Sequence, residues 1–509
     1  MPFDESLKEL NTRKQKALLM GGEKKLAERK AEGLLNARER VDLLFDTGTF
    51  IESGMFATSS RPEDKANTPA DGKVSGFGRI NGREAAVIAN DFTVKGASSA
   101  NINIKKLKHM KGTARKRGIP IVFLGESTGA RMPDVMGADS IGSKDDPVEY
   151  MRMRENPWAA AVLGHCYGSS AWYASMSDFC VFRKGAHMAV SSPRRIKMAT
   201  GNSIEPEALG GCQVHAEASG IADQVVDTDE QAIAAVKQFL SYLPSHHNEP
   251  PPEHPVPAGS GADMAKIMDL LPASNNQVFD VKRIVRTIVD KDSMFEMKSR
   301  FGRAVCTAFA RLDGKSVGII ANNPLHKGGA IGAQECQKVQ AFFVLCDSFN
   351  IPVVLLVDQP GFLIGVEGEQ VGITGKVMNW LNAMTLVTVP KLSVIMRKSY
   401  GLAVSNMGAG GNADEVACWF TAEISFMKPE FGAQIAYGAS PNDPEKFQEA
   451  VNKMTKGTTA YDMASIYTAQ DVIDPRNTRE WLIRMLEVHR MRLSGGVGQH
   501  LMRTWPTSY

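Results

Sequence analysis

Two stretches of the chain carry the same signature: residues 319–328 read IIANNPLHKG and residues 87–96 read VIANDFTVKG. Each is followed, after a helical interval, by an apolar run that contains Ile-Pro and reaches a glycine: NIPVVLLVDQPGF at 350–362 and GIPIVFLGESTGA at 118–130. The matching Ala, Lys, Pro and Gly positions keep one constant offset along the chain. Several landmarks in the same order and at the same spacing indicate an internal duplication.

The order of elements within each copy predicts an α/β fold. A β-branched run comes first, a helical stretch follows, and a buried strand then ends in an acidic residue and glycine. Strand, helix and strand joined by short turns predict right-handed βαβ units, with parallel sheets covered by helices. We therefore expect the segments 85–200 and 315–430 to have the same strand order.

A proline-rich segment separates the two copies. Residues 245–261 read SHHNEPPPEHPVPAGSG and contain five prolines, which continue neither a helix nor a central strand. We place one domain at 1–248, a linker at 249–261 and a second domain at 262–509. Apolar residues at helical spacing in residues 1–45 predict an amphipathic lead-in to the first domain.

The composition argues against several classes of protein. The 59 basic and 56 acidic residues nearly balance, so no nucleic-acid surface is expected. The seven cysteines are dispersed without a CxxC pair, which argues against zinc and for a reducing compartment, taken here as the cytoplasm. The N-terminal stretch is polar, and no window approaches the ~20 apolar residues of a membrane span. We therefore expect no metal in this chain and no membrane insertion.

Glycine turns follow the predicted strands, two in each copy. They lie at 125–131, 165–171, 358–365 and 398–403. A helix N-terminus offers free backbone N–H groups at the positive end of the helix dipole, and glycine lets a ligand approach them. Two such donors aimed at one atom form an oxyanion hole. Steric need explains any single glycine turn, but a matched pair in each copy favours ligand binding at the strand ends.

Motifs for other chemistries are missing from the sequence. It contains no GxSxG elbow, no GxxxxGK[ST] phosphate loop and no HExxH helix, and its ten histidines have no metal-ligand spacing. The chain thus supplies backbone donors without an evident nucleophile or metal site. The chemistry that fits is stabilisation of an enolate or oxyanion, with a cofactor or the substrate handling the proton.

Long segments resemble the carboxyltransferase (β) subunits of propionyl-CoA carboxylase and related biotin-dependent acyl-CoA carboxylases. They are residues 26–52, 91–98, 199–223, 349–365 and 389–403. The resemblance implies two tandem crotonase-like (ClpP/crotonase) domains of repeated ββα and βαβ units, the first for an acyl-CoA and the second for biotin. It also implies a biotin carboxylase and a biotin carboxyl carrier as partners, and a homo-hexamer whose active sites lie between neighbouring subunits.

The same resemblance places the catalytic backbone donors at one turn in each copy. The positions are Gly168, Ser169 and Ser170 in the first copy, and Gly401, Leu402 and Ala403 in the second. Ser169 and Leu402 stand where the family usually has a second glycine, and Tyr167 stands where it usually has alanine. These differences keep the N–H donors but narrow the approach to them.

Further residues complete the expected site. The expected acyl-CoA-binding residues are Gly129, Ala130, Tyr167 and Lys106. The expected biotin-binding residues are Gly361, Phe362 and Tyr400. Lys106, the counterpart of Lys338, is explained either by a contact with CoA phosphates or by a solvated helix face. Phe362 either lines the biotin pocket or belongs to the core.

Three hypotheses follow for the function. The first is a carboxyltransferase that moves a carboxyl group between carboxybiotin and the α-carbon, or vinylogous carbon, of an acyl-CoA; a transcarboxylase or decarboxylase runs this reaction in reverse. The second is a crotonase-like hydratase, isomerase or thioesterase, which needs a carboxylate near the acyl group; Glu126 is the candidate. The third is a scaffold that has lost activity through Ser169 and Leu402.

Overall fold

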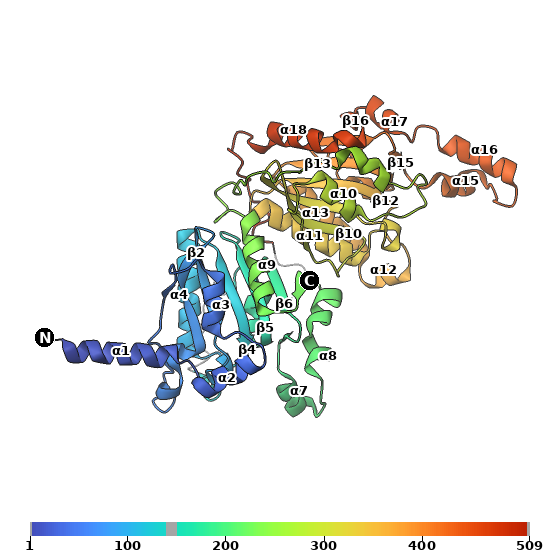
Figure 1. The fold of residues 1–509 in the computed structure, drawn as a ribbon. Helices are drawn as coiled ribbons and strands as arrows, with labels where there is room; N and C mark the ends of the chain where they lie inside the picture. Colours follow the sequence, from blue (N-terminus) through green and yellow to red (C-terminus); the bar gives the residue numbers. More distant parts are fainter. Residues whose placement is uncertain (1–2, 139–149, 506–509) are drawn as a thin grey trace. The chain divides into compact units, whose positions relative to one another are not determined.

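A computed structural model describes residues 3–138 and 150–505, and the chain divides into two compact units (Figure 1). Unit 1 is Met1–Ser241 and unit 2 is Tyr242–Tyr509. The division falls just before the proline-rich segment, which therefore belongs to unit 2. Nδ2 of Asn350 donates to the carbonyls of His247 and Glu249, both at 2.7 Å, so this segment packs on unit 2 instead of forming a free linker.

Unit 1 is built on an eight-stranded sheet with the order β1-β2-β3-β4-β5-β6-β8, and β7 pairs with β5. The first three strands are antiparallel, and the remaining neighbours are parallel. The strands are β1 (Ile51–Glu52), β2 (Lys73–Ile80), β3 (Arg83–Asn90), β4 (Ile121–Ser127), β5 (Trp158–Tyr167), β6 (Phe179–Arg183), β7 (His187–Ala189) and β8 (Gln224–Val226).

Helices cover this sheet and close its core. They are α1 (Asp4–Leu18), α2 (Glu23–Ala31), α3 (Ala37–Leu44), α4 (Asn101–Arg117), α6 (Ser169–Ser175), α7 (Pro193–Thr200), α8 (Pro206–Gly210) and α9 (Asp229–Tyr242). Leu107 and Met110 of α4 are buried in one cluster with Ile88 and Phe123 of the sheet. Gly118 ends α4 in the left-handed conformation, which lets the chain turn directly into β4.

Unit 2 repeats this arrangement in a second eight-stranded sheet, with the order β9-β10-β11-β12-β13-β14-β16 and with β15 beside β13. Its strands are β9 (Phe295–Met297), β10 (Val305–Leu312), β11 (Lys315–Asn322), β12 (Val353–Gln359), β13 (Lys391–Tyr400), β14 (Glu415–Trp419), β15 (Glu423–Ser425) and β16 (Asp471–Ile473). Its helices are α10 (Val281–Ile288), α11 (Ala333–Ser348), α12 (Val366–Gln370), α13 (Ile373–Leu386), α14 (Ala403–Asn406), α15 (Pro429–Tyr437), α16 (Pro444–Met454), α17 (Ala460–Ser465) and α18 (Thr478–Arg490).

The duplication predicted from the sequence is confirmed by the two sheets, which have the same strand order and the same strand directions. Even an irregularity repeats: the strand register shifts between Gly125 and Ser127 in β4 and between Val357 and Gln359 in β12. Helices α7 and α8 extend beyond the sheet of unit 1, and α15 and α16 do so in unit 2 (Figure 1).

Two kinds of feature are missing from the described residues, 3–138 and 150–505. No helix among them is long and apolar enough to cross a bilayer. No group of three or more His, Cys, Asp or Glu side chains among them is placed to hold a metal ion.

Candidate functional site

The turn after β5 and the turn after β13 each begin with a glycine at nearly the same positive φ. Gly168 follows β5 with φ 65°, and Gly401 follows β13 with φ 66°. An L side chain rarely adopts this region, so glycine is required at both places for conformational reasons. We call residues 168–170 the first donor turn and residues 401–403 the second donor turn.

The glycine N–H of each donor turn is already used by the sheet. Gly168 N donates to the Ala189 carbonyl at 3.3 Å, and Gly401 N donates to the Ser425 carbonyl at 3.0 Å. These bonds anchor the turns to β7 and β15. The expected role of the two glycines is therefore to set the backbone, while the donors themselves come from the residues that follow.

The next two residues of each donor turn have free N–H groups. Within the described parts of the chain, no acceptor bonds the backbone N–H of Ser169 or Ser170, nor that of Leu402 or Ala403. All four lie at or beside the start of a short helix, where N–H groups have no intrahelical partner. Each turn therefore offers a pair of adjacent donors suited to an oxygen that carries negative charge.

A second glycine turn lies against each donor turn. Gly129 (φ 99°) and Gly361 (φ 118°) follow β4 and β12. A Cβ added to Gly168 would lie 3.6 Å from Gly129 Cα, and a Cβ added to Gly361 would lie 3.9 Å from the Tyr400 carbonyl oxygen. The structure thus brings the predicted glycine turns together in pairs, one pair in each unit.

The side chains beside the donors differ between the units. Ser169 Oγ lies 2.8 Å from Ser99 Oγ, so this hydroxyl is held by a neighbour. Ser170 is buried, and its Oγ accepts a long bond of 3.4 Å from Asn90 Nδ2.

Leu402 is 75% exposed and Ala403 is fully buried. Ala130 is exposed and Phe362 is half-buried, so Phe362 does not belong to a closed core.

An aromatic stack borders the first donor turn. The ring of Tyr167 stacks on His165 with centroids 5.7 Å apart, and His165 stacks on His187 at 5.5 Å. His187 Nε2 lies 3.1 Å from a carboxylate oxygen of Glu207. In unit 2, the hydroxyl of Tyr400 donates to Glu423 at 2.6 Å, and burial together with this carboxylate raises the pKa of Tyr400. The two matching tyrosines therefore sit in different polar surroundings.

Glu126, the candidate base of the hydratase hypothesis, is fully engaged in ion pairs. Both of its oxygens accept from Arg29 at 2.9 Å, and one also accepts from Arg40 at 2.6 Å. Burial alone would raise the pKa of Glu126, but the arginines outweigh it and hold the pKa below its usual range. A carboxylate held in this way is a poor general base, which argues against a hydratase or isomerase.

Asp358 occupies the same position in unit 2 and is also neutralised. Its Oδ2 lies 2.8 Å from Arg397, its Oδ1 lies 3.5 Å from Lys398 Nζ, and the side chains of Asp358 and Arg397 are buried. The acidic residue at the end of each central strand is thus a structural anchor. These partners could not be predicted from the sequence, because Arg29 and Arg40 are far from Glu126 along the chain.

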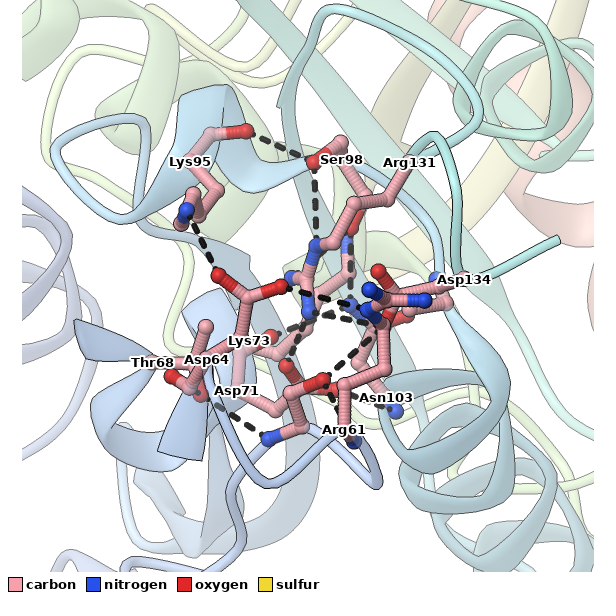
Figure 2. Close-up of polar contacts among 12 residues, drawn as sticks. Arg61, Asp64, Thr68, Asp71, Lys73, Lys95, Ser98, Asn103, Arg131 and Asp134 are labelled. Atoms are coloured by element: carbon pink, nitrogen blue, oxygen red, sulfur yellow. Dashed lines mark hydrogen bonds and ion pairs between the residues drawn. The ribbon is translucent and has the colours of Figure 1, made fainter. Parts of the chain in front are cut away.

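A buried polar cluster in unit 1 includes Arg131, which ends the glycine turn after β4 (Figure 2). Arg131, at the end of the turn after β4, contacts Asp71 at 2.5 Å and also donates to the Ser98 carbonyl at 3.2 Å. Asn103 donates to the carbonyls of Asp71 and Ser98 at 3.0 and 2.9 Å. Lys73 belongs to the same cluster and is 1% exposed. Sequence reasoning did not identify this cluster.

Lys106 differs from both sequence interpretations. It is buried, and its ammonium donates to the carbonyls of Gly54, Ala70 and Lys73, the first two at 3.0 and 2.9 Å. Burial lowers the pKa of Lys106 to about 8. Because its three protons have protein acceptors, the lysine is not a solvated surface residue, and this arrangement argues against a CoA phosphate contact. Lys338 repeats the arrangement in unit 2.

Comparison with known proteins assigns the chain to a family. Residues 28–494 match the family described as Carboxyl transferase domain. The chain belongs to the carboxyl transferase domain family. The expectation of a carboxyltransferase enzyme is therefore confirmed, as is the resemblance to the β subunits of acyl-CoA carboxylases.

Relatives of this carboxyltransferase match it over nearly their whole length. The carboxyltransferase subunit of propionyl-CoA carboxylase from Haloferax mediterranei is 33% identical, with 96% of this chain and 98% of the relative covered. The 12S subunit of methylmalonyl-CoA carboxyltransferase from Propionibacterium freudenreichii subsp. shermanii is 34% identical, with 92% and 91% covered. The α subunit of methylmalonyl-CoA decarboxylase from Veillonella parvula is 32% identical, with 95% of each covered.

A solved structure shares the fold of the carboxyltransferase. The crystal structure of transcarboxylase 12S, described as a hexamer assembly with methylmalonyl-coenzyme A bound, has a TM-score of 0.88 at 32% identity, with 96% of each chain covered. The predicted fold class, two tandem crotonase-like domains, is confirmed.

Proposed function

We propose that this carboxyltransferase moves a carboxyl group between biotin on a carrier partner and the α-carbon of an acyl-CoA. The first donor turn binds the thioester oxygen and the second donor turn binds the ureido oxygen of biotin. The supporting observation is the pair of free N–H groups in each turn, at Ser169 and Ser170 and at Leu402 and Ala403. These donors are aligned before the substrate arrives, so no reorganisation is needed when charge develops.

The thioester side of the proposal rests on unit 1. An enolate forms when an acyl-CoA loses its α-proton, and its charge collects on the thioester oxygen. The N–H groups of the first donor turn stabilise that oxygen more strongly in the enolate than in the neutral thioester, which is the condition for catalysis. Gly129, Ala130 and Tyr167 lie beside this turn and are the proposed contacts of the acyl group.

The residues of unit 2 fit a ureido carbonyl. The N–H groups of Leu402 and Ala403 are unpaired among the described residues, and the Gly401 N–H beside them is held by the Ser425 carbonyl. Gly361, Phe362 and Tyr400 are the proposed walls, since they surround the second donor turn. When it is bound, biotin supplies the transferable carboxyl group and a nitrogen able to take a proton.

The identity of the acyl-CoA substrate and the direction of carboxyl transfer are proposals of finer detail. Relatives include a carboxylase subunit, a transcarboxylase subunit and a decarboxylase subunit at similar identity. We propose an acyl-CoA as substrate without restricting it to propionyl-CoA, because Tyr167 and its histidine stack occupy space next to the first donor turn. A cytoplasmic location stays a prediction.

We further propose a homo-hexamer, because the transcarboxylase 12S structure is described as a hexamer assembly. Light scattering at micromolar concentration measures the mass directly. Mixed oligomers sharpen the test: the variants G168V and G401V each keep one intact donor turn. If an active site takes its turns from two subunits, refolding or exchanging the two variants together restores part of the activity that neither has alone. A monomer contradicts the assembly.

One assay tests the function. The purified chain is mixed with a biotin carboxylase, a biotinylated carrier, ATP, labelled bicarbonate and a panel of acyl-CoA thioesters. We expect label in an acid-stable acyl-CoA product only when all partners are present. Hydration of an enoyl-CoA by the chain alone, or ATP-dependent carboxylation without partners, contradicts the proposal.

A further inference from the structure

The strand that begins each unit's main hairpin opens with a buried residue that is ionisable in one unit and apolar in the other. Lys73 opens β2 and pairs across the hairpin with Asn90, while Val305 opens β10 and pairs with Asn322. The two pairs hold the same position in the duplicated sheets. Both Lys73 and Val305 are buried at 1% exposure or less. A lysine in place of a valine in a sheet interior needs an explanation, because burying an amine has a high free-energy cost.

The amine of Lys73 lies in the polar cluster of unit 1 (Figure 2) and is linked to the glycine turns through hydrogen bonds. Its Nζ donates to Asn90 Oδ1 and to the Ala97 carbonyl, both at 2.9 Å. Asn90 Nδ2 reaches Ser170 Oγ at 3.4 Å, in the first donor turn. One side chain therefore connects the amine to a residue whose backbone N–H is a proposed donor.

A second path links the amine to the neighbouring glycine turn. The Ala97 carbonyl also accepts from Ser127 Oγ at 3.0 Å, and Ser127 Oγ accepts from Gly129 N at 3.1 Å. Both turns of unit 1 thus rest on groups that bond Lys73. In unit 2, Asn322 Oδ1 instead accepts from Asp358 N at 3.1 Å, and Val305 offers no donor from its side chain.

The number of acceptors around Lys73 matches its neutral form. Two acceptors satisfy the two N–H groups of an amine, whereas the three N–H groups of an ammonium leave one without an acceptor among the described residues. Lys106 nearby and Lys338 in unit 2 have three or more acceptors each. Lys73 therefore differs from Lys106 and Lys338 in that its hydrogen-bond acceptors suit the neutral amine.

Burial has the largest influence on the pKa of Lys73, and four ionisable groups also act on it. Asp71 raises its pKa from η2 (Pro69–Gly72), Arg131 lowers it from the turn after β4, Cys166 raises it from β5, and Lys106 lowers it from α4. Burial is the largest influence and lowers the pKa of Lys73 to about 7. Asp71 is itself held by Arg131, and burial raises the pKa of the Cys166 thiol to about 12, so neither is free to neutralise Lys73.

We propose that Lys73 is a positioning residue of the acyl-CoA site, whose amine takes up a proton when an enolate oxygen occupies the first donor turn and so stabilises that charge from behind. The inference rests on the proposed assignment of unit 1 to the acyl-CoA. Under this proposal, a buried amine stabilises the charge at the first donor turn, and no such amine occupies the matching position in unit 2, where Val305 stands. Asn90 and Ser170 transmit the effect, and Lys73 does not touch the substrate.

Two CoA thioethers provide the test. S-carboxymethyl-CoA places a permanent negative charge near the thioester oxygen, and S-acetonyl-CoA places a neutral carbonyl there. In the wild-type chain at pH 8, calorimetry in buffers of different ionisation enthalpy should show proton uptake with the carboxylate and none with the ketone. Lys73 is mostly neutral at this pH, and a nearby anion raises its pKa. Lowering the pH through about 7 should remove the uptake while the anion binds more tightly.

Substitutions locate the proton. K73M should abolish the uptake and reduce the preference for the carboxylate over the ketone about tenfold, the scale of one screened charge a few ångström away. K73R should keep the preference. K338M removes a buried lysine of unit 2 and should change neither quantity. Thermal unfolding checks each variant, and the wild-type uptake needs no variant at all.

The outcomes separate the two proposals. Unchanged uptake and preference in folded K73M overturn the role of Lys73 and leave the function intact. If wild type binds the carboxylate at the first donor turn without proton uptake, Lys73 likewise has no such role. If neither thioether competes with acyl-CoA substrates at unit 1, the assignment of unit 1 fails and the inference fails with it.

Discussion

Units 1 and 2 share a backbone but differ in the charges buried beneath it. Their sheets have one strand order, their donor turns have φ values of 65° and 66°, and both pairs of N–H donors are free among the described residues. Behind the first donor turn lie Lys73, Asp71 and Arg131, while Val305 takes the place of Lys73 in unit 2. The duplicated backbone therefore supplies the same binding feature twice, and buried side chains adapt each copy to its own ligand.

The strongest test of this comparison concerns the acidic strand ends. E126Q leaves buried Arg29 without its counter-charge and leaves Arg40 with Asp229 alone, and we expect a loss of about 3–5 kcal/mol in the free energy of unfolding. D358N should cost less, since Lys398 is partly exposed and can turn to solvent. Chemical denaturation with hydrogen exchange of each unit measures both. The exposed pair of Glu9 and Arg13 provides the control E9Q, expected below about 0.5 kcal/mol.

The pH dependence of this effect has a definite sign. The pKa of Glu126 is lowered in the folded chain, so its stabilisation is complete above the ordinary glutamate pKa and is lost as the pH falls through the lowered value. The advantage of the wild type over E126Q should therefore shrink in acid. An advantage that grows in acid would contradict the ion-pair interpretation.

The next test asks whether the two donor turns contribute equally. G168V and G401V each place a β-branched residue at a left-handed φ, which shifts the following N–H groups. We expect each to lower carboxyl transfer about a hundredfold, the scale of losing one oxyanion donor. Gly185, which also has positive φ with open space around it, gives the control G185A, with transfer preserved. Full transfer rates in both valine variants would eliminate the two-turn mechanism.

A smaller effect is expected where the tyrosines differ. Y167A removes the ring that stacks on His165 and should shift the ratio of kcat/KM between larger and smaller acyl-CoA substrates about tenfold. Y400F removes only the hydroxyl bonded to Glu423 and should leave that ratio unchanged. Acyl-CoA competition experiments measure both ratios. Equal shifts in the two variants would show that the units do not divide the ligands as proposed.

The smallest effects belong to the positions that depart from the family. S169G and L402G should change transfer only by about threefold, because the donors are backbone N–H groups that any residue supplies. Initial rates with free biotin and with carrier-bound biotin check this. L402G should act chiefly on biotin and S169G chiefly on the acyl-CoA. Loss of activity in either variant would mean that the side chain is needed.

Much of the fold could be predicted from the sequence because duplication leaves a record at fixed spacing. The landmarks from Ala89 to Gly129 and from Ala321 to Gly361 predicted the repeated strand order of both sheets, while the family resemblance pointed to residues 168–170 and 401–403 among the four glycine turns. These signals are local, since turn geometry depends on a few adjacent residues.

The buried charges could not be predicted in this way. A lysine at the start of a strand usually faces solvent. Lys73 is buried because α4 and the turn after β4 pack over it. Lys106 was expected at a surface or a phosphate, but its carbonyl acceptors come from Gly54 and from the segment of Ala70 and Lys73, both distant from it in sequence. Partners such as Arg40 for Glu126 are distant in sequence, so spacing carries no record of them.

The repeated register shift at Gly125 and Val357 shows what the duplication holds constant. Both sheets keep this distortion although they are proposed to serve different ligands, so it belongs to the repeated backbone and not to either ligand. Because the donors are main-chain groups, point mutations after the duplication altered the surroundings without erasing the reactive feature. Such a protein can acquire a new substrate through a handful of surface and core changes while its chemistry is inherited intact.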